Sequence, residues 1–345
     1  MKKTTFVAVI ITLLVSLMAC QKLQVTTDST EKEVLEKEIS IRSAHSNWLE
    51  EKFQAEIVNI GLKKLGYQIE KPKEIDYSAI YISVANGDLD YSVVNYEKLH
   101  SKFFEQAGGE KKMERVGVLT DNLVQGYQID KKTADQYQIT NLEQLKEPKI
   151  AKLFDSDGDG KANLIGCNPG WGCELVINHH LKAYGLEDTV EHNQGRYTAL
   201  IADLITRYKQ GESVLYYAYN PHWISSILKV DEDVIWLEVP FTSLPEEQGS
   251  FTEKDTTVED ENRGFAIDRI RIFANKKFLE NNLVAKRWFE LVEIPDSDIS
   301  AESLRLKNGE DSPEDIRRHA EEWVKSNQEL FDGWVEEARK AASET

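Results

Sequence analysis

Short apolar runs alternate with segments of helical periodicity from about residue 39 to the C-terminus. In residues 53–66, Phe53, Ile57 and Ile60 recur three or four positions apart, and the pattern stops at a glycine. The alternation of predicted strands and helices indicates an α/β fold, with mixed sheets flanked by helices. Strands are predicted at 39–45, 67–70, 89–96, 116–120, 124–130, 213–219 and 234–239, and helices at 53–66, 80–88, 198–211, 286–293 and, as one long helix, from Ser312 and Pro313 towards the C-terminus.

The predicted division into lobes rests on the chain length and on the lack of a flexible linker. The chain has 345 residues, enough for two lobes, but no internal repeat and no Pro/Gly/Ser-rich linker. If two lobes are present, the chain passes between them through strands, near residues 124–130 and 234–240. We therefore expect one lobe of residues 39–126 plus 241–345 and a second lobe of residues 127–240.

Residues 1–20 have the features of an export signal. Two lysines precede the apolar run 6–18, which is too short to span a membrane easily. Leu17-Met18-Ala19-Cys20 resembles a bacterial lipobox, in which the cysteine is lipidated and becomes the mature N-terminus. Residues 21–38 are polar and suit a tether. We expect an extracytoplasmic lipoprotein, in the periplasm or on the cell surface, held at the membrane only by Cys20; the alternative is cleavage near Ala19, which leaves a free thiol.

Composition and motifs narrow the class of function. The net charge of −18 is spread along the chain, which argues against a nucleic-acid partner and is consistent with solubility. The sequence contains no G-x-S-x-G, H-E-x-x-H, P-loop or G-x-G-x-x-G motif. His179 and His180 are adjacent and point to different faces of a helix. These observations favour a binding protein over an enzyme.

The stretch GCNPGWGC, residues 166–173, carries two of the three cysteines. If Cys20 is lipidated, Cys167 and Cys173 remain to pair, and export favours that disulfide. The bond would fix the turn around Trp171. Because a helix is predicted to follow this turn, its first N–H groups and the positive end of its dipole would form an anion site beside the indole ring.

Aromatic residues gather at predicted strand ends. Tyr96 ends one strand, and the stretch SVLYYAYNPHW carries the others: Tyr216, Tyr217, Tyr219 and Trp223. Simple packing at a sheet edge would explain this pattern. Rings brought together from separate strand ends would instead form a cage for a quaternary ammonium, since ligands of α/β sheets bind beyond the carboxyl ends of strands.

Residues 155–166, DSDGDGKANLIG, resemble a calcium-binding loop. Asp155, Asp157 and Asp159 stand at positions 1, 3 and 5, and Asn163 stands at position 9. Position 12 holds glycine in place of the bidentate glutamate, so two oxygen ligands are missing. The alternative is a polar loop of Asx turns. Calcium is thus a candidate ligand, and no other cofactor or metal is expected.

Long stretches of the chain resemble a known family. They include LGYQIEKPKEIDY, QGYQIDKKTADQYQITNLEQLK, PKIAKLFDSDGDGKANLIGCNPGWGCE and HNQGRYTALIADLITRYKQG. From about residue 39 to the C-terminus the chain is similar to the periplasmic glycine betaine/proline betaine binding proteins of osmoprotectant-uptake ABC transporters. The resemblance implies a two-lobed periplasmic-binding-protein fold (type II) that closes by a hinge on a ligand in the cleft between lobes.

The resemblance also implies where the ligand cation binds. In the family, three tryptophans enclose the quaternary ammonium, and the flanking residues align these positions with Tyr96, Trp171 and Tyr219. Two of the three indoles are therefore replaced by phenols, which are smaller and weaker cation–π partners. Tyrosine hydroxyls can in addition accept hydrogen bonds from less methylated amines.

The family binds the ligand carboxylate with backbone N–H groups that match Gly172 and Cys173 and with a histidine that matches His100; its loop disulfide matches Cys167–Cys173. The resemblance implies a monomer that delivers betaine-type osmolytes to the permease of an ABC importer. Alternatives are the same fold binding choline, a sulfonium analogue or a less methylated amine, and an exported thiol oxidoreductase that uses Cys167 and Cys173.

Overall fold

The computed structural model describes residues 39–343, which belong to one compact unit, Glu38–Thr345. The signal peptide, Cys20 and the tether, predicted for residues 1–38, lie outside the described residues. Among the helices that the structure describes, none is both long and apolar enough to cross a membrane.

A mixed sheet runs through this unit. In residues 39–343 it has nine strands, in the order β4-β2-β5-β13-β6-β9-β7-β8, and β10 pairs with β6 as well. The pairs β2–β5 and β7–β9 are parallel, whereas those of β6 with β13 and β9 are antiparallel. The strands are β2 Ser43–His45, β4 Lys73–Glu74, β5 Tyr91–Tyr96, β6 Met113–Asp130, β7 Ala162–Ile165, β8 Val190–Asn193, β9 Leu215–Asn220, β10 Val234–Leu237 and β13 Asp268–Asn275.

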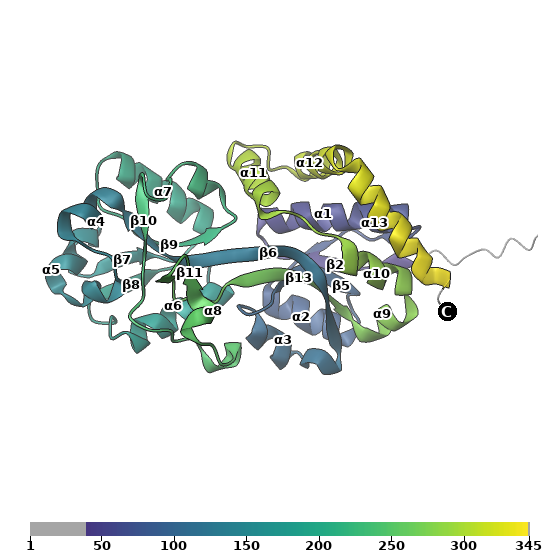
Figure 1. Ribbon diagram of the computed structural model, residues 1–345, viewed down its shortest axis with the longest axis horizontal. Coiled ribbons are helices and arrows are strands. Elements are labelled where there is room, and N and C mark those ends of the chain that lie inside the picture. The colour runs from purple at the N-terminus through teal and green to yellow at the C-terminus, as the bar shows by residue number, and fades with distance from the viewer. Residues whose placement is uncertain (1–38, 344–345) are drawn as a thin grey trace, which may run out of the picture. The chain divides into compact units, whose positions relative to one another are not determined.

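Helices cover this sheet in two groups, joined by the long strands β6 and β13 (Figure 1). One group surrounds β7, β8 and β9, and the other surrounds β2 and β5. The helices are α1 Leu49–Lys64, α2 Tyr77–Asn86, α3 Ser101–Gln106, α4 Lys131–Tyr137, α5 Pro148–Ala151, α6 Gly172–Ala183, α7 Tyr197–Lys209, α8 Glu253–Thr256, α9 Lys276–Asn281, α10 Leu283–Leu291, α11 Asp296–Lys307, α12 Pro313–Ser326 and α13 Gln328–Lys340.

Strand β6 connects the two groups by changing partners along its length. Its first part pairs with β13 as far as Leu123, and Val124–Ile129 pair with β9. The sequence predicted two strands here, 116–120 and 124–130, and the structure shows one. The strand continues past Asn122, whose φ is 59°, because pairing with β13 resumes at Leu123 and pairing with β9 begins at Val124. The lobe boundaries at residues 126/127 and 240/241 stay a prediction.

Two further predicted elements are divided in the structure. The strand expected at 39–45 is split into β1 Ser40–Ile41, which pairs with β3 Gln68–Ile69, and β2. Between β1 and β2, the backbone N–H of Arg42 donates to Asp90 Oδ2 at 2.7 Å instead of to a strand. The C-terminal helix begins with Ser312 as N-cap, as predicted, but α12 ends at Ser326 and α13 follows.

Candidate functional site

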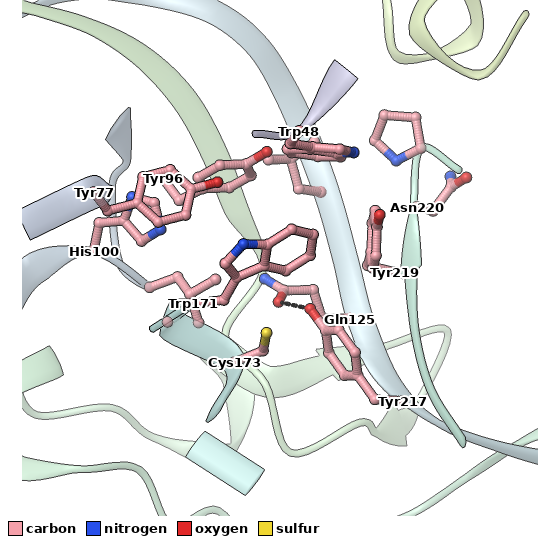
Figure 2. A pocket seen from close by; sticks show the side chains of 14 residues that line it. Trp48, Tyr77, Tyr96, His100, Gln125, Trp171, Cys173, Tyr217, Tyr219 and Asn220 are labelled. Atoms are coloured by element: carbon pink, nitrogen blue, oxygen red, sulfur yellow. Dashed lines mark hydrogen bonds between the residues drawn. The ribbon is translucent and has the colours of Figure 1, made fainter. Parts of the chain in front are cut away.

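Several aromatic side chains line one cavity, and four of them stand where a strand or turn meets the next element (Figure 2). Trp48 and Trp171 immediately precede the first residues of α1 and α6. Tyr96 is the last residue of β5, and Tyr219 is the penultimate residue of β9. Because these positions lie at the ends of their elements, the four side chains reach one common space, although Tyr96 and Tyr219 are still paired with Ile270 and Gln125 on neighbouring strands.

The indole of Trp48 lies among the three aromatic residues that the sequence predicted. Its ring centroid is 5.6 Å from that of Tyr96, 6.0 Å from that of Trp171 and 5.4 Å from that of Tyr219. Sequence reasoning missed Trp48. A signal was available, because Trp48 follows the predicted strand 39–45 and precedes a helix, which is the same kind of position that singled out Tyr96.

Every residue predicted to bind the ligand lines this cavity, whose volume is about 40 Å³. The structure thus brings the predicted cation and carboxylate positions together, and their roles in binding stay predictions. The lining residues are Trp48, Tyr77, Tyr96, Leu99, His100, Leu123, Gln125, Trp171, Gly172, Cys173, Tyr217, Tyr219, Asn220 and Pro221.

Of the other aromatic candidates, Tyr217 lines this cavity, whereas Tyr216 and Trp223 do not. Tyr217 shares a face of β9 with Tyr219 and lines the cavity, where its hydroxyl donates to Gln125 Oε1 at 2.6 Å. Tyr216 points to the opposite face, because side chains alternate along a strand, and its hydroxyl donates to Gln128. Trp223 lines a neighbouring, larger cavity of about 380 Å³ that shares the rings of Trp48, Trp171 and Tyr219.

The loop before α6 is built as the sequence predicted. Cys167 and Cys173 form a disulfide with a Cα–Cα distance of 6.5 Å. Gly172 and Cys173 are the first two residues of α6, where a helix provides no acceptor for the backbone N–H groups. Gly170 N–H donates to Glu174 Oε2 at 2.6 Å, which fixes the turn. Gly172 and Cys173 both line the cavity, and the binding of a carboxylate by their N–H groups stays a prediction.

Gly172 packs directly against the turn that follows β5. A Cβ atom on Gly172 would lie 2.6 Å from Leu99 Cγ, 2.8 Å from Leu99 O and 3.2 Å from His100 Cδ2. His100 is 1% exposed, and its Nδ1 lies 3.1 Å from Val94 O and 3.2 Å from Tyr81 Oη. Burial lowers the pKa of His100 to about 3, so its ring is neutral at physiological pH.

Two hydroxyl groups in the cavity lack partners. Tyr96 Oη and Tyr219 Oη are buried and have no hydrogen-bond partner among residues 39–343. Burial raises the pKa of both hydroxyls well above the usual value, so both remain protonated. Each is able to accept one hydrogen bond and to donate another.

Two buried glutamates follow Trp48 at the start of α1. Glu51 accepts from the hydroxyls of Ser46 and Tyr77 at 2.6 and 2.7 Å, and Glu50 accepts from the hydroxyl of Ser303. Burial raises the pKa of each glutamate to about 7. Glu50 also lines the larger neighbouring cavity, together with the rings of Trp48, Trp171 and Tyr219.

The first part of the predicted calcium loop, residues 155–161, forms Asx turns, and its residues 162–165 are strand β7. Asp155 accepts from Gly158 N–H at 2.6 Å and from Gly160 N–H at 2.9 Å. Asn163 Oδ1 accepts from Ser156 N–H at 2.6 Å. The Asp155, Asp157 and Asp159 carboxylates each bring an oxygen within 4.8 Å of the others. Calcium binding by these residues and Asn163 stays a prediction.

The sequence of the chain is similar to those of known proteins. The model of a family described as the substrate-binding domain of ABC-type glycine betaine transport systems matches residues 39–326. A glycine betaine-binding periplasmic protein of Dickeya dadantii is 50% identical over 307 residues, 89% of this chain and 92% of the relative. The glycine betaine/proline betaine-binding periplasmic protein of Escherichia coli is 47% identical over 317 residues, 92% of this chain and 95% of the relative.

Solved structures share the fold. A glycine betaine/L-proline-binding protein of Borrelia burgdorferi superposes with a TM-score of 0.68 at 20% identity, covering 88% of this chain and 99% of the other. A lactococcal protein complexed with glycine betaine superposes with a TM-score of 0.64 at 18% identity, covering 86% and 99%. These likenesses confirm the predicted type II, two-lobed periplasmic-binding-protein fold.

Proposed function

The chain belongs to the family of substrate-binding domains of ABC-type glycine betaine transport systems, and from this premise we propose that it captures betaine-type osmolytes and delivers them to an ABC importer. Members of the family bind and hand over a ligand, so the chain is a transport protein and not an enzyme. The thiol oxidoreductase alternative is therefore wrong. Cys167 and Cys173 form the loop disulfide.

One observation supports the ligand class. The aromatic rings of Trp48, Tyr96, Trp171 and Tyr219 and the amide end of α6 line the same small cavity. Ring faces attract a methylated cation, and a helix N-terminus attracts a carboxylate. A betaine carries both groups on one short molecule, so it matches the two halves of the site.

The role at the ligand carboxylate predicted for His100 requires an N–H on Nε2. Nδ1 lies 3.1 Å from Val94 O, which only accepts, and 3.2 Å from Tyr81 Oη. In the neutral ring the proton is therefore on Nδ1 and is donated to Val94 O, so donation from Nε2 to a carboxylate stays a prediction.

The binding free energy requires both the aromatic rings and the carboxylate contacts. A desolvated cation–π contact contributes about 2 kcal/mol, and micromolar binding requires about 8 kcal/mol net of the losses on association. Hydrogen bonds to the carboxylate, at about 1.5–3 kcal/mol each, supply the difference. We expect choline, which lacks the carboxylate, to bind at least tenfold more weakly than glycine betaine. Isothermal titration with glycine betaine, proline betaine, choline and dimethylsulfoniopropionate tests this ranking, and equal affinity for choline would contradict it.

The relatives are periplasmic, and the chain works outside the cytoplasm. We propose further that it is a monomer anchored by lipid on Cys20, on the basis of Leu17-Met18-Ala19-Cys20. In a cell that expresses the full chain, Cys20→Ala should release the protein from the membrane fraction. Equal recovery of wild type and variant in that fraction would contradict the anchor.

Ligand capture by hinge closure is part of the proposal. The predicted lobes, residues 39–126 plus 241–345 and residues 127–240, would move about the strands that connect them. In such closure a few residues between the lobes take up the change in backbone dihedral angles. A decrease in the radius of gyration on addition of glycine betaine, measured by small-angle scattering, would support closure.

A further inference from the structure

The turn that carries Trp48 is held by a buried serine. Strand β2 ends at His45 and α1 begins at Leu49, so residues 46–48 connect them. Within this turn the backbone N–H of Trp48 donates to Ser46 Oγ at 3.1 Å. A serine hydroxyl that accepts from the N–H two residues later fixes a local turn. The place of the Trp48 indole in the cavity therefore depends on the place of Ser46.

The side chain of Glu51 holds that serine. Glu51 Oε2 accepts from the Ser46 hydroxyl at 2.6 Å and from the Ser46 N–H at 2.9 Å. Its other oxygen, Oε1, accepts from the Tyr77 hydroxyl at 2.7 Å. Glu51 is buried in the first turn of α1, where the helix dipole favours a carboxylate. One buried carboxylate thus receives three hydrogen bonds from two segments that are distant in the sequence.

Tyr77 connects the same carboxylate to the other half of the site. It is the first residue of α2, and its ring lines the cavity with its centroid 4.3 Å from that of His100 (Figure 2). His100 in turn packs on Gly172, because a Cβ atom there would lie only 3.2 Å from His100 Cδ2. Glu51 therefore fixes the Tyr77 ring against an imidazole that contacts the first residue of α6, where the ligand carboxylate is proposed to bind.

We propose that Glu51 is a positioning residue of the binding site, which holds the Trp48 indole and the His100 imidazole in place through Ser46 and Tyr77. This inference rests on the proposed function, since it concerns the residues that shape the site for a betaine. Among the described residues, neither Glu51 nor Ser46 lines the cavity, so both act through groups that do. A site whose groups are already held in place loses less entropy when it binds its ligand.

Calorimetric titration of the full chain with glycine betaine and choline separates the two connections, because choline has the quaternary ammonium but no carboxylate. Ser46→Ala removes the acceptor of the Trp48 N–H and should weaken the binding of both ligands by a common factor of about threefold to tenfold. Tyr77→Phe keeps the ring and removes the hydroxyl that anchors it. It should weaken glycine betaine by a similar factor but choline by less than about twofold.

Two substitutions of the carboxylate itself complete the series. Glu51→Ala breaks both connections and should weaken glycine betaine more than either hydroxyl variant does, by at least about tenfold. Glu51→Gln is the conservative variant, since its amide oxygen accepts from Ser46 and its amide nitrogen donates to Tyr77 Oη. It should bind both ligands within about twofold of the wild type.

Ser92→Ala is the matched control, because the buried Ser92 hydroxyl donates to Ala44 O at 2.7 Å and neither residue lines the cavity. It should lower the thermal unfolding midpoint and leave both affinities unchanged. If Glu51→Ala does not fold, Ser46→Ala and Tyr77→Phe give the same comparison.

Two results would overturn the inference and leave the proposed function intact. One is that the Ser46, Tyr77 and Glu51 variants lower the unfolding midpoint as Ser92→Ala does, with both affinities unchanged. The other is an equal loss of choline and glycine betaine binding in Tyr77→Phe. Failure of the wild type to bind glycine betaine would overturn both the inference and the proposed function.

Discussion

Two phenol rings stand where the family resemblance leads one to expect indoles, and Trp48 brings another indole to the same cavity from the turn before α1. An indole binds a cation more strongly than a phenol does. Sequence reasoning left Trp171 as the sole tryptophan of the cation box, and the structure places Trp48 beside it, 6.0 Å away between centroids. The loss of ring area at Tyr96 and Tyr219 is therefore offset by a residue far from both in the sequence.

Replacement of Trp48 tests whether its indole contributes to ligand binding. Trp48→Ala should weaken glycine betaine binding about tenfold to thirtyfold, because one desolvated cation–π contact contributes about 2 kcal/mol. Calorimetry gives the change in Kd directly. Trp236→Ala is the control, since Trp236 is a half-buried indole of β10 that lies away from the cavity and packs on Arg263. A change of less than twofold for Trp48→Ala would contradict the role of this ring.

At the level of elements, helix α6 and the turn after β5 meet at the site. The first residue of α6, Gly172, has no room for a side chain against Leu99. The disulfide and the hydrogen bond from Gly170 to Glu174 hold the preceding turn. Such a preformed turn lowers the entropy lost when the carboxylate is bound.

Gly172→Ala should therefore weaken glycine betaine binding at least tenfold. Its Cβ would lie 2.6 Å from Leu99 Cγ and 2.8 Å from Leu99 O, and relieving such overlap costs about 1–3 kcal/mol and moves the amides away from the carboxylate. Gly195→Ala is the control, because its Cβ would meet Leu200 at an ordinary 3.5 Å. Titration and thermal unfolding of both variants separate loss of binding from loss of stability, and unchanged binding by Gly172→Ala would show that the contact is not needed.

Across the whole molecule, burial raises the pKa of some acids and lowers the pKa of some histidines, so the two groups affect stability at different pH values. Burial raises the pKa of Glu50 and Glu51 to about 7. Their contribution to stability is complete below pH 4.5 and is lost as the pH rises through 7. Burial lowers the pKa of His100, His180 and His222 to about 3. The contribution of these histidines is present above pH 6.5 and is lost as the pH falls.

Comparing the unfolding free energies of a variant and the wild type isolates the contribution of one glutamate. Relative to wild type, Glu50→Gln should gain about 2 kcal/mol of unfolding free energy between pH 5 and pH 8, because glutamine never has to ionise in its buried place. Urea unfolding at several pH values measures this gain. Glu310→Gln is the control, since the hydrogen bonds to Glu310 from Arg318 and His319 lower its pKa to about 2, outside the range tested. Parallel curves for Glu50→Gln and wild type would contradict the raised pKa.

Local patterns predicted much of this architecture. The Cys167–Cys173 pair was predicted from the cysteine count and the export signal, the start of α12 at Pro313 from its N-cap, and the strand that ends at Tyr96 from its composition. Strand β6 was not predicted, because its continuity depends on the partners β13 and β9, which are distant in sequence. Trp48 was not predicted either, since its neighbours in space come from β5, β9 and the turn before α6.

The two indoles in the cavity also make the protein its own optical reporter. Of the seven tryptophans in the chain, Trp48 and Trp171 lie close enough, 6.0 Å between ring centroids, for their electronic transitions to couple. A cation that enters between them separates the rings and changes the polarity around both. Intrinsic fluorescence and near-ultraviolet circular dichroism should therefore follow occupancy without any label, so that the amount of osmolyte in a sample is read from the light that the protein absorbs and emits.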